Sequence, residues 1–409
     1  MTVSKVEEGS ISFNLTNTSI SNKEGELLFY TNGIVVADAT HQVMENGDSL
    51  NPGQTAYAWY EYGYIVQQGA LILPIPGQDT LYYLFHSHRE EGNVQIPLPH
   101  SPFFYYTLIN MQGNSGKGTV LEKNVVVISD TLAVGKLTAV KHANGRDWWI
   151  LVPERDRYSY HRLLLTPDSI VHLGIQPVEP VSGYGTGAAG FVAFSPDGTK
   201  YARHDIRGFP AGHFVRLYDF DRCTGLLSNQ IHLPLTDTAG VGGIAFSPDS
   251  RYLYVSSQEL IYQYDVTTAD VEATQTIVAE TDGYQDTLPN GELWFPSVFS
   301  GAQLGPDGKI YIHSAGGHKH LHVIHHPNEQ GLASDIRQHD IILPTWNNRS
   351  IPNMPNYRLG PLDGSPCDTL GLDNHPLAGF RWEADTLEPL LVEFTDNSFY
   401  EPTEWSWDF

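Results

Sequence analysis

Six histidines lie within fourteen residues of the chain, in the run HSAGGHKHLHVIHH that begins at His313 and ends at His326. Imidazole is a common zinc ligand, so this density suggests a metal site. If the run is a β-strand, alternation places His318, His320 and His322 on one face. Alternate strand residues are about 6.5–7 Å apart and zinc ligands about 2.0–2.1 Å from the metal, so a third ligand normally comes from another segment.

We therefore take His318 and His320 as the candidate metal ligands, with zinc or calcium as the ion. The competing interpretation is an ordinary strand whose imidazoles are packed or face solvent. The Gly316-Gly317 pair, which suggests a loop that holds His318, agrees with this second interpretation.

A second group of candidates lies in segments that the sequence marks as loops. His86 and His88 have the same spacing of two and precede a proline-rich insertion, and residues 205–213 form a similar polar loop. Long insertions between strands often shape a binding face, although plain loop variation is the simpler explanation. The candidate ligand-contact residues are His86, His88, Arg89, Arg207, His213, Trp294 and Trp346.

Known catalytic motifs are absent from the sequence. Residues 185–190 fit G-x-G-x-x-G, but they lead into a strand instead of a helix, so a loop is the better interpretation. Ser195-Pro-Asp-Gly-Thr resembles the Asp box of sialidases without its Trp, and it recurs as a turn. The chain contains no G-x-S-x-G, H-E-x-x-H or P-loop, and we assign no catalytic residue.

Composition narrows the class of partner. The 409 residues carry a net charge of -24, which disfavours nucleic acid and anionic lipid, and leaves a protein, a glycan or a divalent ion open. No apolar run approaches the roughly 20 residues of a membrane helix. Cys223 and Cys367 are too few for a disulfide scaffold; one bridge is possible, and two unpaired thiols are the favoured reading.

An internal repeat determines the expected fold. The segments 191–201, 244–254 and 302–311 each combine a short apolar strand, a tight Pro-Asp turn and a second strand. Weaker copies lie upstream, and a second hairpin follows each one. The turn positions, roughly 50–70 residues apart, are Gly25, Gly77, Gly145, Gly198, Ser250 and Gly308.

Four short antiparallel strands per repeat predict an all-β fold, a β-propeller of four-stranded blades. Six blades are visible directly. We favour seven, because the strand-like pieces 10–15 and 380–383 could join the two chain ends and remove an exposed edge; six is the alternative.

Several stretches resemble one family. The runs 22–33, 41–47, 136–145 and 217–225, and above all Ile351-Pro-Asn-Met-Pro-Asn-Tyr-Arg-Leu-Gly-Pro-Leu-Asp-Gly364, are similar to Bacteroidota surface propellers of the WD-repeat or YVTN type. Those proteins carry PKD domains and type IX secretion or gliding-associated sorting domains. The resemblance implies a propeller over residues 1–383, a linker at 384–390 and the truncated first strands of an Ig-like PKD domain at 391–409. It brings no catalytic residues.

The resemblance also implies a place and a role. The sequence starts without a signal-peptide core, so either the protein is cytoplasmic or the given chain is a fragment; the resemblance favours a fragment of an extracellular or cell-surface protein. We expect a monomeric, non-catalytic interaction or adhesion propeller that binds a protein or glycan at its face. The alternatives are a lectin-like propeller and a metal-dependent hydrolase or lactonase with its ion in the central channel.

Overall fold

The computed structural model describes residues 3, 5–6, 11–92, 99–155, 158–180, 189–206, 212–384, 391–398, 400, 402 and 404–406. These residues form 27 strands, one short helix, α1 (Gln54–Ala58), and three 3-10 turns. The prediction of an all-β propeller with small antiparallel blades is confirmed. None of the described helices has the length and apolar character needed to cross a membrane.

Each blade consists of strands that are consecutive in sequence. Blade 1 has three strands among the described residues, β1 (Thr18–Ser21), β2 (Leu27–Thr31) and β3 (Val36–Asp38). The next two blades are β4 (Ala70–Pro74), β5 (Leu81–Ser87), β6 (Ser101–Asn110) and β7 (Thr119–Leu132), then β8 (Ala139–Lys141), β9 (Trp148–Pro153), β10 (Ser159–Leu165) and β11 (Ile170–Pro177).

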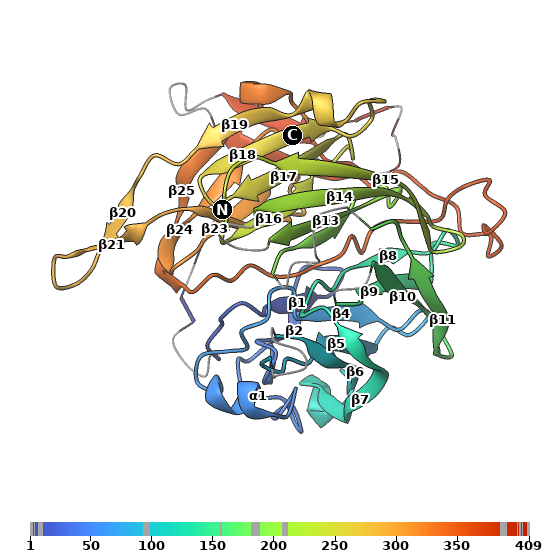
Figure 1. Cartoon of the computed structure of the whole chain (residues 1–409). Coiled ribbons are helices and arrows are strands. Elements are labelled where there is room, and N and C mark those ends of the chain that lie inside the picture. Colours follow the sequence, from blue (N-terminus) through green and yellow to red (C-terminus); the bar gives the residue numbers. More distant parts are fainter. Residues whose placement is uncertain are drawn as a thin grey trace.

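Blades 4 to 6 lie in the upper half of Figure 1 and blades 1 to 3 in the lower half. Their strands are β12 (Val192–Phe194), β13 (Lys200–Ile206), β14 (His213–Asp221) and β15 (Leu226–Leu235); β16 (Gly242–Phe246), β17 (Tyr252–Ser257), β18 (Leu260–Asp265) and β19 (Thr276–Glu280); and β22 (Phe299–Leu304), β23 (Ile310–Ser314), β24 (His318–Ile324) and β25 (Ile336–Asn347).

Apolar side chains hold five neighbouring pairs of blades together. One buried cluster spans each pair from blades 1 and 2 to blades 5 and 6. Phe85 of blade 2 and Ile150 of blade 3, both fully buried, belong to one such cluster. No apolar cluster of the described residues joins blade 6 to blade 1. The ring therefore needs another means of closure at this sixth joint.

Asn353 supplies that closure. Its backbone N–H donates to the carbonyl of Asn17 (2.8 Å), and its carbonyl accepts from the Thr18 hydroxyl (2.8 Å), both in or beside blade 1. Its side-chain amide donates to the carbonyls of Ala70 and Leu137 at the inner edges of blades 2 and 3 (2.9 Å each). One residue thus ties three blades to the segment that follows blade 6.

The rest of this segment extends the closure across the ring. The Gln303 side chain of blade 6 donates to the Met354 carbonyl (3.2 Å), and the Tyr357 hydroxyl donates to the Ile72 carbonyl of blade 2 (2.7 Å). In Figure 1 the orange-red trace after β25 runs between the upper and lower groups of blades. Residues 349–357, which we call the closing segment, thus lie where the strands of the blades converge.

A disulfide fixes the chain beyond the closing segment. Cys223, in the turn after β14 of blade 4, bonds to Cys367, and the two are 144 residues apart. The favoured reading of two free thiols is wrong, because the closing segment carries Cys367 back to a turn that the sequence alone could not place beside it.

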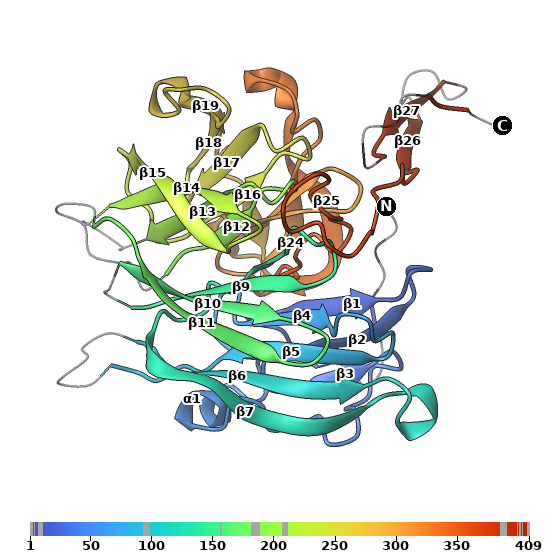
Figure 2. The same cartoon turned by 90° about the vertical axis from the view of Figure 1, so that its right-hand side faces the viewer.

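The prediction of a seventh blade is not confirmed. Residues 380–384 form β26 (Phe380–Ala384), which pairs with β27 (Val392–Asp396) and not with the N-terminal piece. Figure 2 shows this hairpin at the edge of the molecule. Arg381 and Asn397 attach it to blade 6 by donating to the Asp307 carbonyl (3.1 and 2.8 Å). Its assignment to an Ig-like domain stays a prediction, and most of the expected linker lies outside the described residues.

Replacing Asn353 by alanine tests the closing segment. The Asn353→Ala variant leaves two buried carbonyls without their donor, and each such loss costs about 1–3 kcal/mol. We expect the free energy of unfolding, measured with urea, to fall by roughly 2–4 kcal/mol. Asn356→Ala is the matched control, since the half-buried Asn356 side chain donates to one carbonyl, that of Pro196, and otherwise only accepts the N–H of the nearby Arg358. Equal losses in both variants would contradict the closure role.

The disulfide should stabilise the same region independently. A bridge that closes a long loop typically contributes about 2–4 kcal/mol, so Cys367→Ser should lower the free energy of unfolding by that amount. Reductant should bring the wild-type protein down to the variant's value and leave the variant unchanged. A wild type insensitive to reductant would show that the bridge contributes nothing.

Candidate metal centre

The histidine column lies on β24 of blade 6. His318, His320 and His322 alternate with more exposed neighbours and are at most 2% exposed. Alternation places them on the strand face that also carries Ile324, which packs in the cluster between blades 5 and 6. The imidazoles are therefore gathered inside this joint and do not face bulk solvent.

A hairpin between blades 5 and 6 adds a carboxylate to the column. It consists of β20 (Gln285–Thr287) and β21 (Leu293–Pro296) and projects beside β24 and β25 in Figure 1. Its Asp286 Oδ2 lies 2.9 Å from Nδ1 of His318 and 3.7 Å from Nδ1 of His320. The same oxygen accepts the backbone N–H of Lys319 (3.2 Å), which fixes the carboxylate over the strand.

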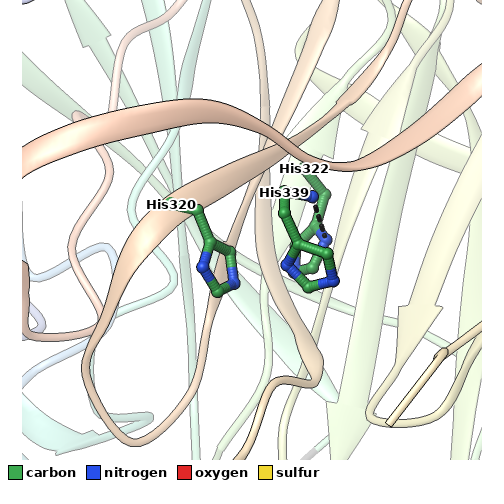
Figure 3. A group of neighbouring side chains, drawn as sticks. All are labelled: His320, His322 and His339. Atoms are coloured by element: carbon green, nitrogen blue, oxygen red, sulfur yellow. Dashed lines mark hydrogen bonds between the residues drawn. The ribbon is translucent and has the colours of Figure 1, made fainter. Parts of the chain in front are cut away.

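The outer strand β25 contributes a fourth imidazole. An irregularity in the β24–β25 pairing and a left-handed backbone at His339 (φ 56°) turn this side chain toward the column. Its ring centroid lies 4.2 Å from that of His320 and 4.9 Å from that of His322. Figure 3 shows the three side chains as one group. Nε2 of His339 lies 3.1 Å from both carboxylate oxygens of Asp282.

These side chains form two overlapping triads of ligand-type atoms, each triad within 4.8 Å. One is His320, His322 and His339, and the other is Asp286, His318 and His320. In His339 and His318, one nitrogen meets a carboxylate while the other, Nδ1 of His339 and Nε2 of His318, is buried without a hydrogen-bond partner. A carboxylate on one imidazole nitrogen and a metal on the other is the usual arrangement at zinc sites.

The electrostatics keep the imidazoles in the form that binds metals. Burial, reinforced by the neighbouring His339, lowers the pKa of His320 to about 4 and that of His322 to about 2. Burial also lowers the pKa of His318, although Asp286 opposes this shift. Burial raises the pKa of Asp286, but hydrogen bonds from His318 and Lys319 lower it by more. The pKa of this carboxyl group is therefore lower than usual. Near neutral pH the column thus offers the neutral imidazoles of His318, His320 and His322 beside the ionised carboxylate of Asp286.

Two of the predicted ligand-contact residues lie beside this group. Trp294 on β21 donates its indole N–H to the Gly316 carbonyl (2.9 Å), just before the column. Its ring lies 6.0 Å from that of Trp346 on β25, and Lys319 Nζ is 5.3 Å from the Trp346 ring. The neighbouring Phe295 is 66% exposed. An aromatic rim therefore adjoins the imidazole group.

The predicted residues of the first insertion lie at another joint. His86 is buried between Asn51 (2.8 Å) and Thr107 (3.0 Å), which satisfy both ring nitrogens, so it acts as a packed core histidine. His88 is buried with one nitrogen 3.7 Å from Glu90, and Arg89 pairs with Glu91. The described part of the insertion thus places His86, His88 and Arg89 in blade 2, away from β24.

His213 belongs to a third polar group, between blades 4 and 5. Its Nδ1 lies 2.8 Å from His204 Nε2 and its Nε2 lies 3.0 Å from Asp237 Oδ1. The Ser257 hydroxyl donates to the same Asp237 and is fully buried, so it is not placed to attack a substrate. Arg207 lies outside the described residues.

Asp282, Asp286 and His339 were not predicted as members of the site. The sequence indicated that a third ligand comes from another segment, but not which one. The ion of the hydrolase alternative was expected in the central channel. The described residues instead put the closing segment there and the imidazole group between blades 5 and 6.

No family model matches the chain. An alignment 113 residues long shows 32% identity to a 6-phosphogluconolactonase from Pectobacterium carotovorum. It covers 23% of this chain and 34% of that protein, so the chain spans about a third of the length of that curated relative.

Among solved structures, a putative 6-phosphogluconolactonase from Bacteroides fragilis is similar at 13% identity and a TM-score of 0.40, covering 81% of this chain and 95% of that one. The periplasmic gluconolactonase of Pseudomonas aeruginosa is similar at 13% identity and a TM-score of 0.40, covering 75% and 77%. The six-blade architecture rests on the strand pairing of this chain itself.

The buried neutral imidazoles predict an acid-sensitive protein. Unfolded histidine has a pKa near 6.5, above the folded value of about 4 for His320, so the unfolded state binds more protons between these values. The stability of the metal-free protein should fall as the pH falls from 7.5 to 5, by about 2 kcal/mol from His320 alone.

Thermal unfolding of chelator-treated protein at several pH values measures this effect. A His320→Gln/His322→Gln variant should show a flatter pH profile than the wild type, because those groups no longer take up protons on unfolding. An unchanged profile in the variant would contradict the assignment of the acid sensitivity to this column.

Proposed function

We propose that this chain is a metal-dependent hydrolase that acts on lactones, with a zinc ion held by His320, His322 and His339. The observation that carries the proposal is the group of three imidazoles from two strands, in which His320 and His322 are buried and His339 is oriented by a carboxylate. These three imidazoles would hold the ion, which would supply activation of a water as nucleophile near neutral pH.

The surrounding residues fit that chemistry. Asp282 orients His339, so that Nδ1 points away from the carboxylate. Tyr284 contacts the His339 ring (4.4 Å) and is 44% exposed, which gives the group a side that solvent and substrate can reach. Trp294 and Trp346 offer apolar ring faces beside it, on which a compact cyclic ester could pack.

The proposed substrate class is based on sequence similarity to a curated lactonase. The 113-residue alignment with the Pectobacterium 6-phosphogluconolactonase supports a lactone as substrate, and hydrolysis of a lactone is a reaction that a zinc-bound water can perform. The similarity covers only part of either chain, so the lactone remains part of the proposal.

The second candidate is the non-catalytic extracellular interaction propeller with a structural metal. The observation that favours it is the exposure of Leu293 (65%) and Phe295 (66%) on the projecting hairpin, which suits a protein partner. The Cys223–Cys367 bridge agrees with an oxidising compartment. In this candidate the ion would only fix the hairpin to blade 6.

Zinc binding and lactone hydrolysis distinguish the candidates. Chelator-treated protein is titrated calorimetrically with zinc and with calcium, and hydrolysis of glucono-δ-lactone and its 6-phosphate is followed with and without zinc. We expect tight zinc binding that weakens at least about 100-fold in His320→Ala/His322→Ala, together with hydrolysis that zinc restores. His326→Ala is the matched control, since it removes a half-exposed imidazole from the same run.

Each outcome decides between the candidates. Zinc binding with hydrolysis that both disappear in the double variant supports the hydrolase. Zinc binding without hydrolysis of either lactone favours the interaction propeller with a structural ion. Absence of zinc binding contradicts the metal site and, with it, the proposed hydrolase.

A further inference from the structure

The joint between blades 3 and 4 buries more positive than negative charge. Lys136, from the segment before β8, and Arg203 and Arg216, from β13 and β14, are each at most 1% exposed. All three contact the fully buried carboxylate of Asp205: Lys136 Nζ and Arg203 Nε lie 2.9 Å from Oδ1, and Arg216 Nη2 lies 2.5 Å from Oδ2. Three basic side chains thus share one carboxylate.

The strand register makes this arrangement unavoidable. Arg203 and Arg216 are direct partners in the β13–β14 ladder, so their guanidinium groups stand side by side on one face of blade 4. Tyr201 and Tyr218 are the next pair on the same face, two residues along each strand. Like charges directly opposite each other repel, and Asp205 offsets only one of them.

The joint also contains buried donors that have no acceptor. Both Nη atoms of Arg203 and Nη1 of Arg216 are buried without a hydrogen-bond partner. The buried hydroxyl of Tyr201 also has no partner, and the buried hydroxyls of Tyr160 and Tyr218 have none except each other. Tyr160 comes from blade 3 and its ring lies 5.8 Å from the Arg203 guanidinium carbon, so these groups surround one place. Leaving so many donors unmatched inside a protein is costly, which indicates that an acceptor belongs among them.

Asp205 cannot be that acceptor for all of these groups. Its two oxygens already receive Lys136, Arg203 Nε, and both Nε and Nη2 of Arg216. The outer edges of the two guanidinium groups remain, and a guanidinium edge matches the spacing of two oxygens on a carboxylate or phosphate. Tyrosine hydroxyls donate readily to the same oxygens.

We infer that the joint between blades 3 and 4 is a binding site for a small oxyanion, which accepts hydrogen bonds from Arg203, Arg216 and the tyrosine hydroxyls. This site is independent of the imidazole group, which lies between blades 5 and 6. Carboxylate and phosphate share the chemistry that these donors recognise, so both serve as probes.

Lys136 provides a second readout. Burial lowers its pKa to about 7, although Asp205 opposes the shift. An added anion beside Arg203 and Arg216 raises that pKa, because it favours the charged ammonium. Binding near pH 8 should therefore be accompanied by proton uptake, which calorimetry detects as a heat that depends on the ionisation enthalpy of the buffer.

The test titrates inorganic phosphate, acetate and chloride into the full chain at fixed ionic strength. We expect saturable binding of phosphate or acetate, a thermal midpoint that rises with the bound anion, and proton uptake at pH 8. Arg203→Gln should weaken binding at least about tenfold. Arg251→Gln is the matched control, since it removes an arginine that pairs with Asp265 on blade 5. The His320→Ala/His322→Ala variant should bind the anion normally.

The titrations distinguish a phosphate ligand from a carboxylate ligand. Tighter binding of phosphate than acetate assigns a phosphate group, and the reverse assigns a carboxylate. If Arg203→Gln does not fold, Arg203→Lys keeps the charge but removes the forked donor, and should weaken binding by a similar factor. Absence of saturable binding by either oxyanion, equal binding of chloride, or undiminished affinity in the folded Arg203 variant would overturn the site.

Discussion

The ring depends on one polar contact at its sixth joint, where Asn353 connects three blades. Each of the other five joints contains an apolar cluster, and such packing is tolerant, since burial of Leu, Ile and Phe stabilises many related geometries. A row of six sheets joined at five places remains an open arc. The amide of Asn353 meets carbonyls of Ala70 and Leu137, and its backbone meets blade 1, so only one arrangement of the ends satisfies all four bonds. Its contribution is specificity of closure as well as stability.

The closing segment fills the centre of the ring, and the buried polar groups lie between neighbouring blades instead. In a propeller whose axis is open, polar side chains from every blade can meet at one point. Here the polar groups lie in the joints, close to where the second strand of a blade gives way to the third. Asp205 and His213 flank that connection in blade 4, and His318 starts the third strand of blade 6. Each group is therefore built by two neighbouring blades and a connecting segment, as Asp286 and Asp282 illustrate.

Local patterns in the sequence predicted the local features of the structure. The repeated Pro-Asp turns mark the first hairpin of blades 4, 5 and 6, where Gly198, Ser250 and Gly308 adopt positive φ (74°, 64° and 78°). Strand alternation placed His318, His320 and His322 on one face. Trp294 and Trp346 were chosen from separate loops, and the structure brings their rings together. The features that follow from short-range geometry could thus be predicted from the sequence.

Features that depend on contacts between distant segments could not be predicted from the sequence. The strand-like pieces 10–15 and 380–383 predict a seventh blade, yet residues 380–384 pair with β27 instead of with the N-terminal piece. His339 joins the site only because a pairing irregularity turns it inward, and Asp286 only because a hairpin folds back over β24. The Cys223–Cys367 bridge spans 144 residues and depends on the same long-range path. A hydrophobic pattern does not encode these relations.

The position of Asn353 in the chain has a consequence for synthesis. Its bond to Thr18 joins residues 335 apart, and its bonds to Ala70 and Leu137 span 283 and 216. A ribosome therefore releases all six blades before the residue that closes them is available. Until then the Asn17 carbonyl and the Thr18 hydroxyl of the first blade lack the partner that Asn353 provides, and an incompletely folded domain is prone to association with other chains. A slow final step of high contact order follows, and expression yield should respond to chaperone capacity more than to the stability of any single blade.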